Sequence, residues 1–111
     1  MTALSELTCE ACSANAKLLT KNEIDSLLLE ISDWEVIVDS DIQKLKREFQ
    51  TKNYQQSISF TNAVAILAES INHHPQIIVE YSSVTVIWWS HNIKGLHKND
   101  FIMAAKTSDI F

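Results

Sequence analysis

The chain contains a single proline, Pro75, which follows a stretch with the periodicity of a long helix. Proline lacks the backbone N–H that a helix needs, and it pushes the residue before it, His74, towards an extended conformation. The helix expected over 53–72 must therefore end before Pro75. We expect the chain to continue as a β-strand over 76–81.

The hydrophobic pattern on both sides of Pro75 alternates between helical and strand periods. After Thr20, which fits a capping box with Glu23, apolar residues recur at the spacing of a helix with one buried face. Other segments alternate apolar and polar residues, as half-exposed strands do. The expected elements are a helix over 20–31, strands over 34–38 and 44–49 around a turn at 39–41, a helix over 53–72, strands over 76–81 and 84–91 around a turn at 82–83, and a helix over 99–106.

This order predicts an α+β fold with a four-stranded, mainly antiparallel sheet and helices packed on one face. We expect residues 20–111 to form a single domain, and residues 1–19, which are small, polar and without a clear period, to form a flexible arm. A sheet of this size has exposed edges, which natural proteins cover, charge or pair with a second subunit. We therefore expect a homodimer or homotetramer.

The chain is acidic, with 9 Lys and Arg against 14 Asp and Glu and a formal net charge of −5. This argues against direct binding to nucleic acids or to anionic membranes, both of which rely on basic surface. The basic cluster of Lys44, Lys46 and Arg47 is expected on a solvated hairpin face or at an intersubunit edge. No signal pattern or bilayer-length apolar stretch is visible, which predicts a cytoplasmic protein.

Glycine and cysteine usage narrows the chemistry further. The single glycine, Gly95, excludes a glycine-rich phosphate loop and a dinucleotide fingerprint. Cys9 and Cys12 have the spacing of a redox motif or of half a zinc site, but no preceding strand or second ligand pair accompanies them. We expect surface thiols on the arm.

Histidines from distant parts of the chain are expected to meet at one end of the second strand pair. A two-residue turn at 82–83 would place His91 opposite His74, with Cβ atoms roughly 5 Å apart. His73 would join them from the helix end. Glu69 stands four residues before His73, so on a continuing helix its carboxylate could accept a ring N–H and favour the charged imidazole.

Residue chemistry alone leaves two other interpretations open. The paired histidines could cap the helix C-terminus, with His91 a surface residue at a strand end. The histidines and Glu69 also match zinc ligand chemistry. Adjacent histidines on an extended chain point to opposite sides, however, and the i, i+4 spacing of metalloproteases is missing, so we expect no metal site.

The spacing of these residues resembles the signature of the pterin-4a-carbinolamine dehydratase family, in its bacterial branch. The matching positions are Glu69, His73-His74-Pro75, Tyr81, His91 and Asp100. The resemblance extends over 20–107 and includes Trp34, the start of the long helix at 49–54, and the segment 88–96. Asn72 departs from the acidic residue that animal members carry beside the first histidine.

This resemblance implies dehydration of 4a-hydroxytetrahydrobiopterin to quinonoid dihydrobiopterin, a hydro-lyase reaction that recycles the cofactor of aromatic amino-acid hydroxylases. In the family, the residues matching His73, His74 and His91 form the pterin site. Histidine suits both proton transfers near neutral pH, so no cofactor is expected. We expect His73 and His91 to exchange protons with the substrate, and His74 to bind the pterin, with its share in the acid role left open.

Trp34 and Trp89 could wall or stack on the flat pterin, although buried tryptophans usually belong to the core. Trp89 is favoured over Trp88 because it shares the strand parity of His91. The resemblance also implies a second class of function, since some animal relatives act as dimerisation partners of a transcription factor. A regulatory protein partner is therefore an alternative to catalysis.

Four further residues lie in or near the matched motif. Pro75 and Ser90 are expected to support the pterin site. Asp100 could hold a substrate or loop group, or could complement the positive end of the last helix. His97 has no partner identifiable from the sequence and is expected to be solvated.

Overall fold

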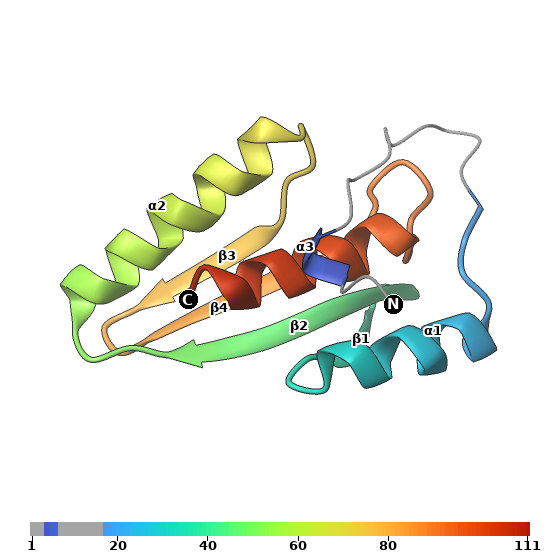
Figure 1. Ribbon diagram of the computed structural model, residues 1–111, viewed down its shortest axis with the longest axis horizontal. Helices are drawn as coiled ribbons and strands as arrows, with labels where there is room; N and C mark the ends of the chain where they lie inside the picture. Colours follow the sequence, from blue (N-terminus) through green and yellow to red (C-terminus); the bar gives the residue numbers. More distant parts are fainter. Residues whose placement is uncertain (1–3, 7–16) are drawn as a thin grey trace.

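The computed structural model describes residues 4–6 and 17–111 (Figure 1). Its elements are the 3-10 helix η1 (Leu4–Glu6), α1 (Lys21–Leu28), the 3-10 helix η2 (Leu29–Ile31), β1 (Glu35–Asp39), β2 (Ile42–Gln50), α2 (Tyr54–Ser70), β3 (Gln76–Glu80), β4 (Ser83–Trp88) and α3 (Lys98–Asp109). From α1 onwards, helices and strands follow one another in the predicted order. Within these described elements there is no helix with the length and apolar character of a membrane span.

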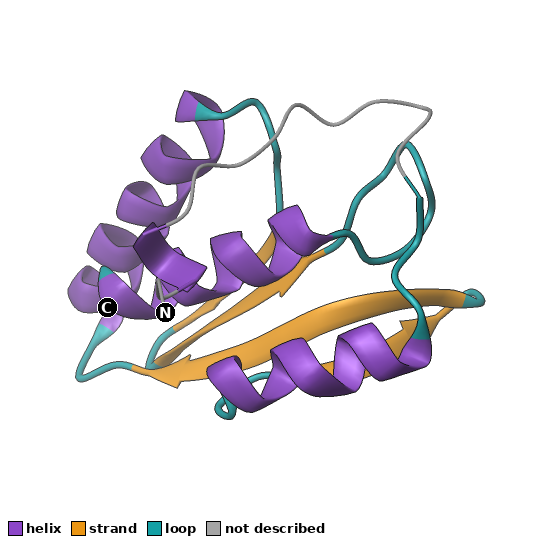
Figure 2. Cartoon of the chain, turned by 45° about the vertical axis from the view of Figure 1, so that its right-hand side comes forward, coloured by secondary structure: helices purple, strands orange, loops and turns teal. Residues whose placement is uncertain are grey.

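The strands form one four-stranded antiparallel sheet in the order β1-β2-β4-β3. Fully buried side chains alternate along its central strands, so that Leu45 and Phe49 of β2 share a face with Val84, Val86 and Trp88 of β4. These residues belong to the same core as residues of the three α-helices, and Figures 1 and 2 show α3 lying along the strands. The predicted α+β fold, with helices on one face of the sheet, is confirmed.

Capping side chains set the starts of α1 and α3. The Thr20 hydroxyl accepts the N–H of Glu23 at 3.2 Å, and the Glu23 carboxylate accepts the N–H of Thr20 at 2.9 Å, so the capping box is confirmed. His97 caps α3, because its Nδ1 accepts the N–H of Asn99 at 3.1 Å. His97, expected to be solvated and without a partner identifiable from the sequence, is thus half-buried and has a capping partner.

The hairpin between β3 and β4 turns one residue earlier than predicted. Glu80 pairs with Ser83, so the turn falls at 81–82 instead of 82–83. The register is thereby displaced by two residues, which leaves every side chain on its predicted face because the side-chain period is two.

β4 ends at Trp88 and does not continue to His91. Its ladder with β3 stops where Gln76 pairs with Ile87, since the preceding Pro75 has no N–H to donate. His91 lies in a turn at 91–94. The prediction that His91 occupies a strand position facing His74 is wrong.

α2 ends at Ser70, before the predicted boundary at 72. Asn72 has a left-handed backbone with φ of 52°, a conformation that asparagine adopts more readily than most residues. The N–H of His73 donates to the carbonyl of Ala68 at 3.2 Å and closes the helix end. His73 thus leaves the helical spiral before it could lie above Glu69.

Part of the predicted N-terminal arm packs on the domain. Leu4 of η1 is buried in the core, and Leu19 donates its N–H to the carbonyl of Leu96 at 3.0 Å. The expectation of a loose arm does not extend to these residues. Cys9 and Cys12 lie outside the described residues.

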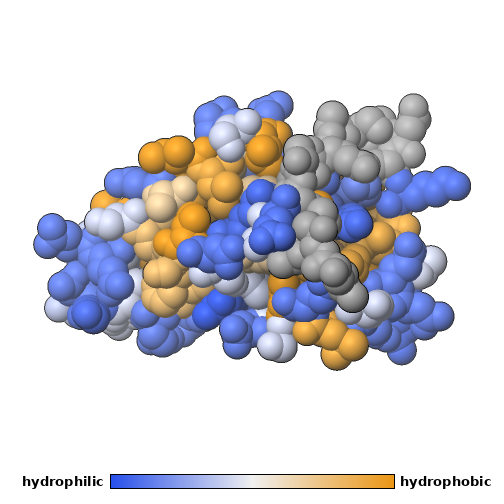
Figure 3. Space-filling model, viewed as in Figure 1, coloured by the Kyte–Doolittle hydropathy of each residue, from blue (hydrophilic) through white to orange (hydrophobic). Residues whose placement is uncertain are grey.

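Apolar side chains also remain on the outer side of α2. Ile58 and Ile66 are 37% and 72% exposed, and Figure 3 shows hydrophobic surface on the side of the molecule where α2 lies. Self-association would bury surface of this kind. The homo-oligomer stays a prediction.

Candidate active site

A cavity of about 270 Å³ is formed between the end of α2 and the turn that follows β4. Its walls come from two distant stretches of the chain and consist of Asn72, His73, His74, His91 and Asn92. The volume lies just below the range typical of small-molecule sites. The structure therefore gathers at one cavity the imidazoles that the sequence analysis singled out.

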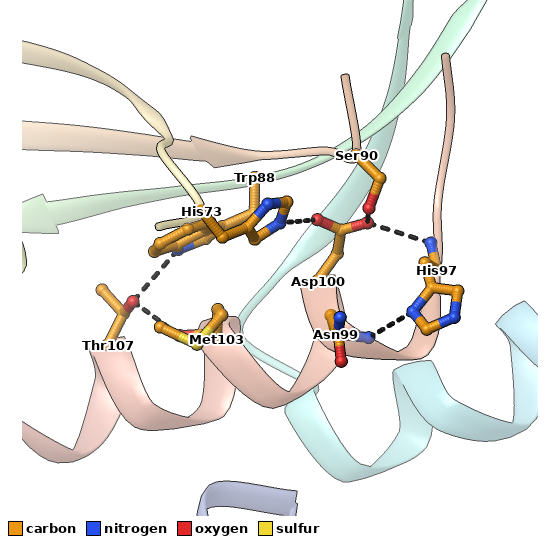
Figure 4. A network of polar contacts seen from close by, with 8 residues as sticks. All are labelled: His73, Trp88, Ser90, His97, Asn99, Asp100, Met103 and Thr107. Carbon is orange, nitrogen blue, oxygen red and sulfur yellow. Dashed lines mark hydrogen bonds and ion pairs between the residues drawn. The ribbon is translucent and has the colours of Figure 1, made fainter. Parts of the chain in front are cut away.

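His73 is the buried member of the group, with 7% of its surface exposed. Its Nε2 lies 2.7 Å from Oδ1 of Asp100, and its ring stacks on Trp88 with centroids 5.4 Å apart (Figure 4). Trp88 is itself anchored, because its indole N–H donates to the hydroxyl of Thr107 at 3.0 Å. The imidazole of His73 is thus fixed by a hydrogen bond with the Asp100 carboxylate and by a rigid aromatic surface.

Asp100 is fully buried and lies in the first turn of α3. Besides meeting His73, its carboxylate accepts the Ser90 hydroxyl at 2.8 Å and the backbone N–H of His97 at 2.9 Å (Figure 4). A carboxylate at this position also interacts favourably with the positive end of the helix dipole. Asp100 therefore holds loop groups and complements the helix end, the two environments that the sequence left open.

Glu69 contacts a different histidine from the one predicted. Its Oε2 lies 3.5 Å from Nε2 of His74, and both side chains are exposed, by 79% and 53% respectively. The reason is the left-handed turn at Asn72, which takes His73 off the helix and turns it inwards. The prediction that Glu69 orients His73 is wrong, and Asp100 occupies that position.

Trp88, the last residue of β4, and Trp89, which follows it, each stack against one of the histidines. Trp88 stacks on His73, whereas Trp89 lies parallel to His91 with centroids 4.4 Å apart and 4° between the ring planes. Neighbouring residues on an extended chain point to opposite sides. His73 and His91 therefore stack on different indoles while lining the same cavity.

Trp89 does not line the cavity itself, and its indole is contacted by the ammonium of Lys44 at 4.0 Å from the ring centroid. Lys44 is 7% exposed and pairs with Asp39 at 2.9 Å. Of the basic cluster expected on a solvated hairpin face or at an intersubunit edge, Lys44 is thus buried, whereas Lys46 and Arg47 are partly exposed.

Trp34 lies away from the cavity. It is 4% exposed, packs edge-on against Phe49 with centroids 5.9 Å apart, and donates its indole N–H to the Ser108 hydroxyl at 2.9 Å. Pro75 stands next to His74, at the point where the β3–β4 ladder stops. The expected role of Trp34 as a wall of the histidine cavity does not fit this position.

Sequence reasoning missed three participants. Trp88 was set aside in favour of Trp89, Asn72 was noted only as a departure from animal relatives, and Asn92 was not singled out. The signal for Asn92 is its position next to His91 in a turn-forming segment. Among the residues that the structure describes, no group of three His, Cys, Asp or Glu side chains is arranged to hold a metal ion.

Comparisons with known proteins point to one family. Residues 17–110 match the family model described as pterin 4 alpha carbinolamine dehydratase. A Nitrosococcus oceani protein provisionally named pterin-4-alpha-carbinolamine dehydratase is 49% identical over 107 residues, which cover 96% of this chain and 95% of that protein. A crystal structure of a transcriptional coactivator/pterin dehydratase from Brucella melitensis matches with a TM-score of 0.76 and 26% identity, over 85% of this chain and 98% of that one.

Proposed function

Because this chain belongs to the pterin 4 alpha carbinolamine dehydratase family, we propose that it dehydrates 4a-hydroxytetrahydrobiopterin to quinonoid dihydrobiopterin. The observation that carries the proposal is the cavity on which His73, His74 and His91 converge. In this role the protein would recycle the pterin used by aromatic amino-acid hydroxylases. The name of the Nitrosococcus oceani relative supports the reaction class.

The reaction removes one molecule of water across a carbon–nitrogen bond. The C4a–O bond breaks as an acid protonates the departing hydroxyl, a base takes the proton from N5, and the electron pair left on N5 forms the C4a=N5 double bond. Electrons balance without an external oxidant or reductant. The catalyst therefore has to supply two correctly placed proton transfers, each contributing roughly 10²- to 10⁴-fold in rate.

We assign these transfers to His73 and His91, which line the same cavity from the end of α2 and from the turn after β4. His73 is held by Asp100 and Trp88, so its ring presents a fixed edge to the cavity. His74 is half-exposed beside Glu69 and binds the pterin at the mouth of the site. The amide side chains of Asn72 and Asn92 offer donors and acceptors to the polar edges of the pterin.

Kinetics of single-histidine variants tests the proposal. With carbinolamine generated in the assay, His73→Ala and His91→Ala are each expected to lower kcat by about 10²-fold or more. His97→Asn is the matched control, because it removes a histidine outside the cavity and places a strong N-cap residue at the start of α3. Near wild-type turnover by both His73→Ala and His91→Ala would overturn the assignment.

A protein-binding role is the second candidate, supported by the coactivator name of the Brucella melitensis relative. A variant with His73, His74 and His91 all replaced by alanine separates the two functions. A partner captured equally by this variant and by the wild type would bind independently of catalysis. Loss of capture together with loss of turnover would tie the partner to the cavity.

A further inference from the structure

His91 lies on an exposed turn, yet its ring has a defined orientation. The imidazole is parallel to the indole of Trp89, within 4° and with centroids 4.4 Å apart. A side chain on a turn loses rotamer freedom when it stacks on a large flat surface. The direction in which His91 faces the cavity therefore depends on where Trp89 lies.

Trp89 is in turn contacted by a buried cation. The Lys44 ammonium lies 4.0 Å from the centroid of the indole, and 7% of the residue is exposed. Lys44 precedes Leu45, which pairs with Trp88, so Lys44 and Trp89 lie side by side at the end of the β2–β4 ladder. The ammonium also pairs with Oδ2 of Asp39 at 2.9 Å.

A lysine is an unusual choice for this position. A buried ammonium loses hydration, and an apolar side chain of similar length would cover the indole without that cost. What a cation adds is attraction to the face of the aromatic ring, which favours one placement of the indole over others. The Lys44 ammonium thus serves two contacts, the ion pair with Asp39 and the attraction to the indole, and the second of these bears on the placement of Trp89.

We infer that Lys44 and Trp89 are positioning residues for His91: Lys44 holds the indole, and the indole holds the imidazole at the cavity. The inference rests on the proposed function, because it concerns the geometry of a proton-transfer group. Neither residue lines the cavity, so neither is expected to bind the pterin directly. Their effect should appear in turnover more than in substrate affinity.

The test combines kinetics with the NMR signals of the His91 ring. In Trp89→Leu, the ring-current shift of the His91 ring protons should disappear, and kcat should fall by about tenfold or more with KM changed by less than about threefold. Lys44→Met should move the same signals and lower kcat in the same direction. Lys44→Arg should restore both, because guanidinium groups also stack on aromatic faces.

Lys46→Met is the matched control, since it removes another cation from the same strand and leaves the Lys44–Trp89 contact in place, and it should leave kcat and the His91 signals unchanged. Thermal unfolding confirms that each variant is folded. Trp89→Leu with the ring-current shift lost but kcat retained would overturn the inference, and so would unmoved His91 signals in Lys44→Met. If the wild type itself fails to dehydrate the carbinolamine, the proposed function falls, while the NMR signals still decide whether Lys44 places Trp89 and His91.

Discussion

Oδ1 of Asp100 lies 2.7 Å from Nε2 of His73, and both side chains are buried. The other carboxylate oxygen is held by the Ser90 hydroxyl and the His97 backbone N–H. A carboxylate restrained on both oxygens cannot rotate, so it fixes the orientation and the tautomer of the imidazole that it faces. Asp100 is therefore a positioning residue for His73.

Asp100→Asn is expected to lower kcat by about 10²- to 10⁴-fold. The amide NH₂ of asparagine cannot accept a hydrogen bond, so it would face either the ring nitrogen of His73 or the donors of Ser90 and His97 without a suitable partner. The free energy of unfolding should fall by about 1–3 kcal/mol, since a buried polar group is left without its partner. Steady-state kinetics and urea unfolding measure the two effects. Ser90→Ala, which removes one hydrogen bond to the same carboxylate, is the control and should cost about 1 kcal/mol with kcat reduced by less than about threefold. Equal losses of kcat in the two variants would contradict the role given to Asp100.

Glu69→Gln, in contrast to Asp100→Asn, is expected to have almost no effect on turnover or stability. The Glu69 carboxylate is exposed and lies 3.5 Å from an exposed His74, and surface pairs of this kind contribute little. We expect the free energy of unfolding to change by less than about 0.5 kcal/mol and kcat by less than about threefold. A loss of kcat as large as that of Asp100→Asn would contradict this expectation and show that Glu69 also acts on the catalytic histidines.

Local periodicity was sufficient to predict the element order and the covered face of the sheet. The spacing of apolar residues after Thr20, the alternation along β2 and the break at Pro75 are each determined by neighbours in the chain. Because the error in the hairpin register was two residues, the paired residues of β3 and β4 keep their predicted faces.

The partners of the histidines could not be predicted in the same way. His73 meets Asp100 and not Glu69 because Asn72 adopts a left-handed conformation, which hydrophobic periodicity does not reveal. Lys44 shows the same limit, since strand alternation placed it on a solvated face. It is buried and contacts Trp89, a residue distant in sequence.

Trp34 is expected to act on stability and not on catalysis. Trp34→Phe keeps an aromatic ring against Phe49 but removes the indole N–H that donates to Ser108, so the free energy of unfolding should fall by about 1 kcal/mol or more. KM and kcat should stay within about twofold of the wild type. Trp88→Phe is the comparison, because it alters the surface on which His73 stacks and should lower kcat. A rise in KM in Trp34→Phe that is not seen in Trp88→Phe would indicate that Trp34 contacts the bound pterin.

The ion pair between Lys44 and Asp39 is expected to make the stability of the protein depend on pH. The hydrogen bond and charge of the Lys44 ammonium lower the pKa of the Asp39 carboxyl below its usual value. A carboxylate with a depressed pKa in the folded state stabilises the fold above its unfolded pKa of about 4, and this stabilisation is lost as the pH falls through the folded pKa. The Tm advantage of the wild type over Asp39→Asn should therefore be present near neutral pH and disappear in acid.

The advantage should be small because the Asp39 side chain is 61% exposed. Thermal unfolding of both proteins from about pH 3 to about pH 7 measures it, and the same comparison in a Lys44→Met background is the control. If the pH-dependent difference is as large without the ammonium as with it, Lys44 is not its cause.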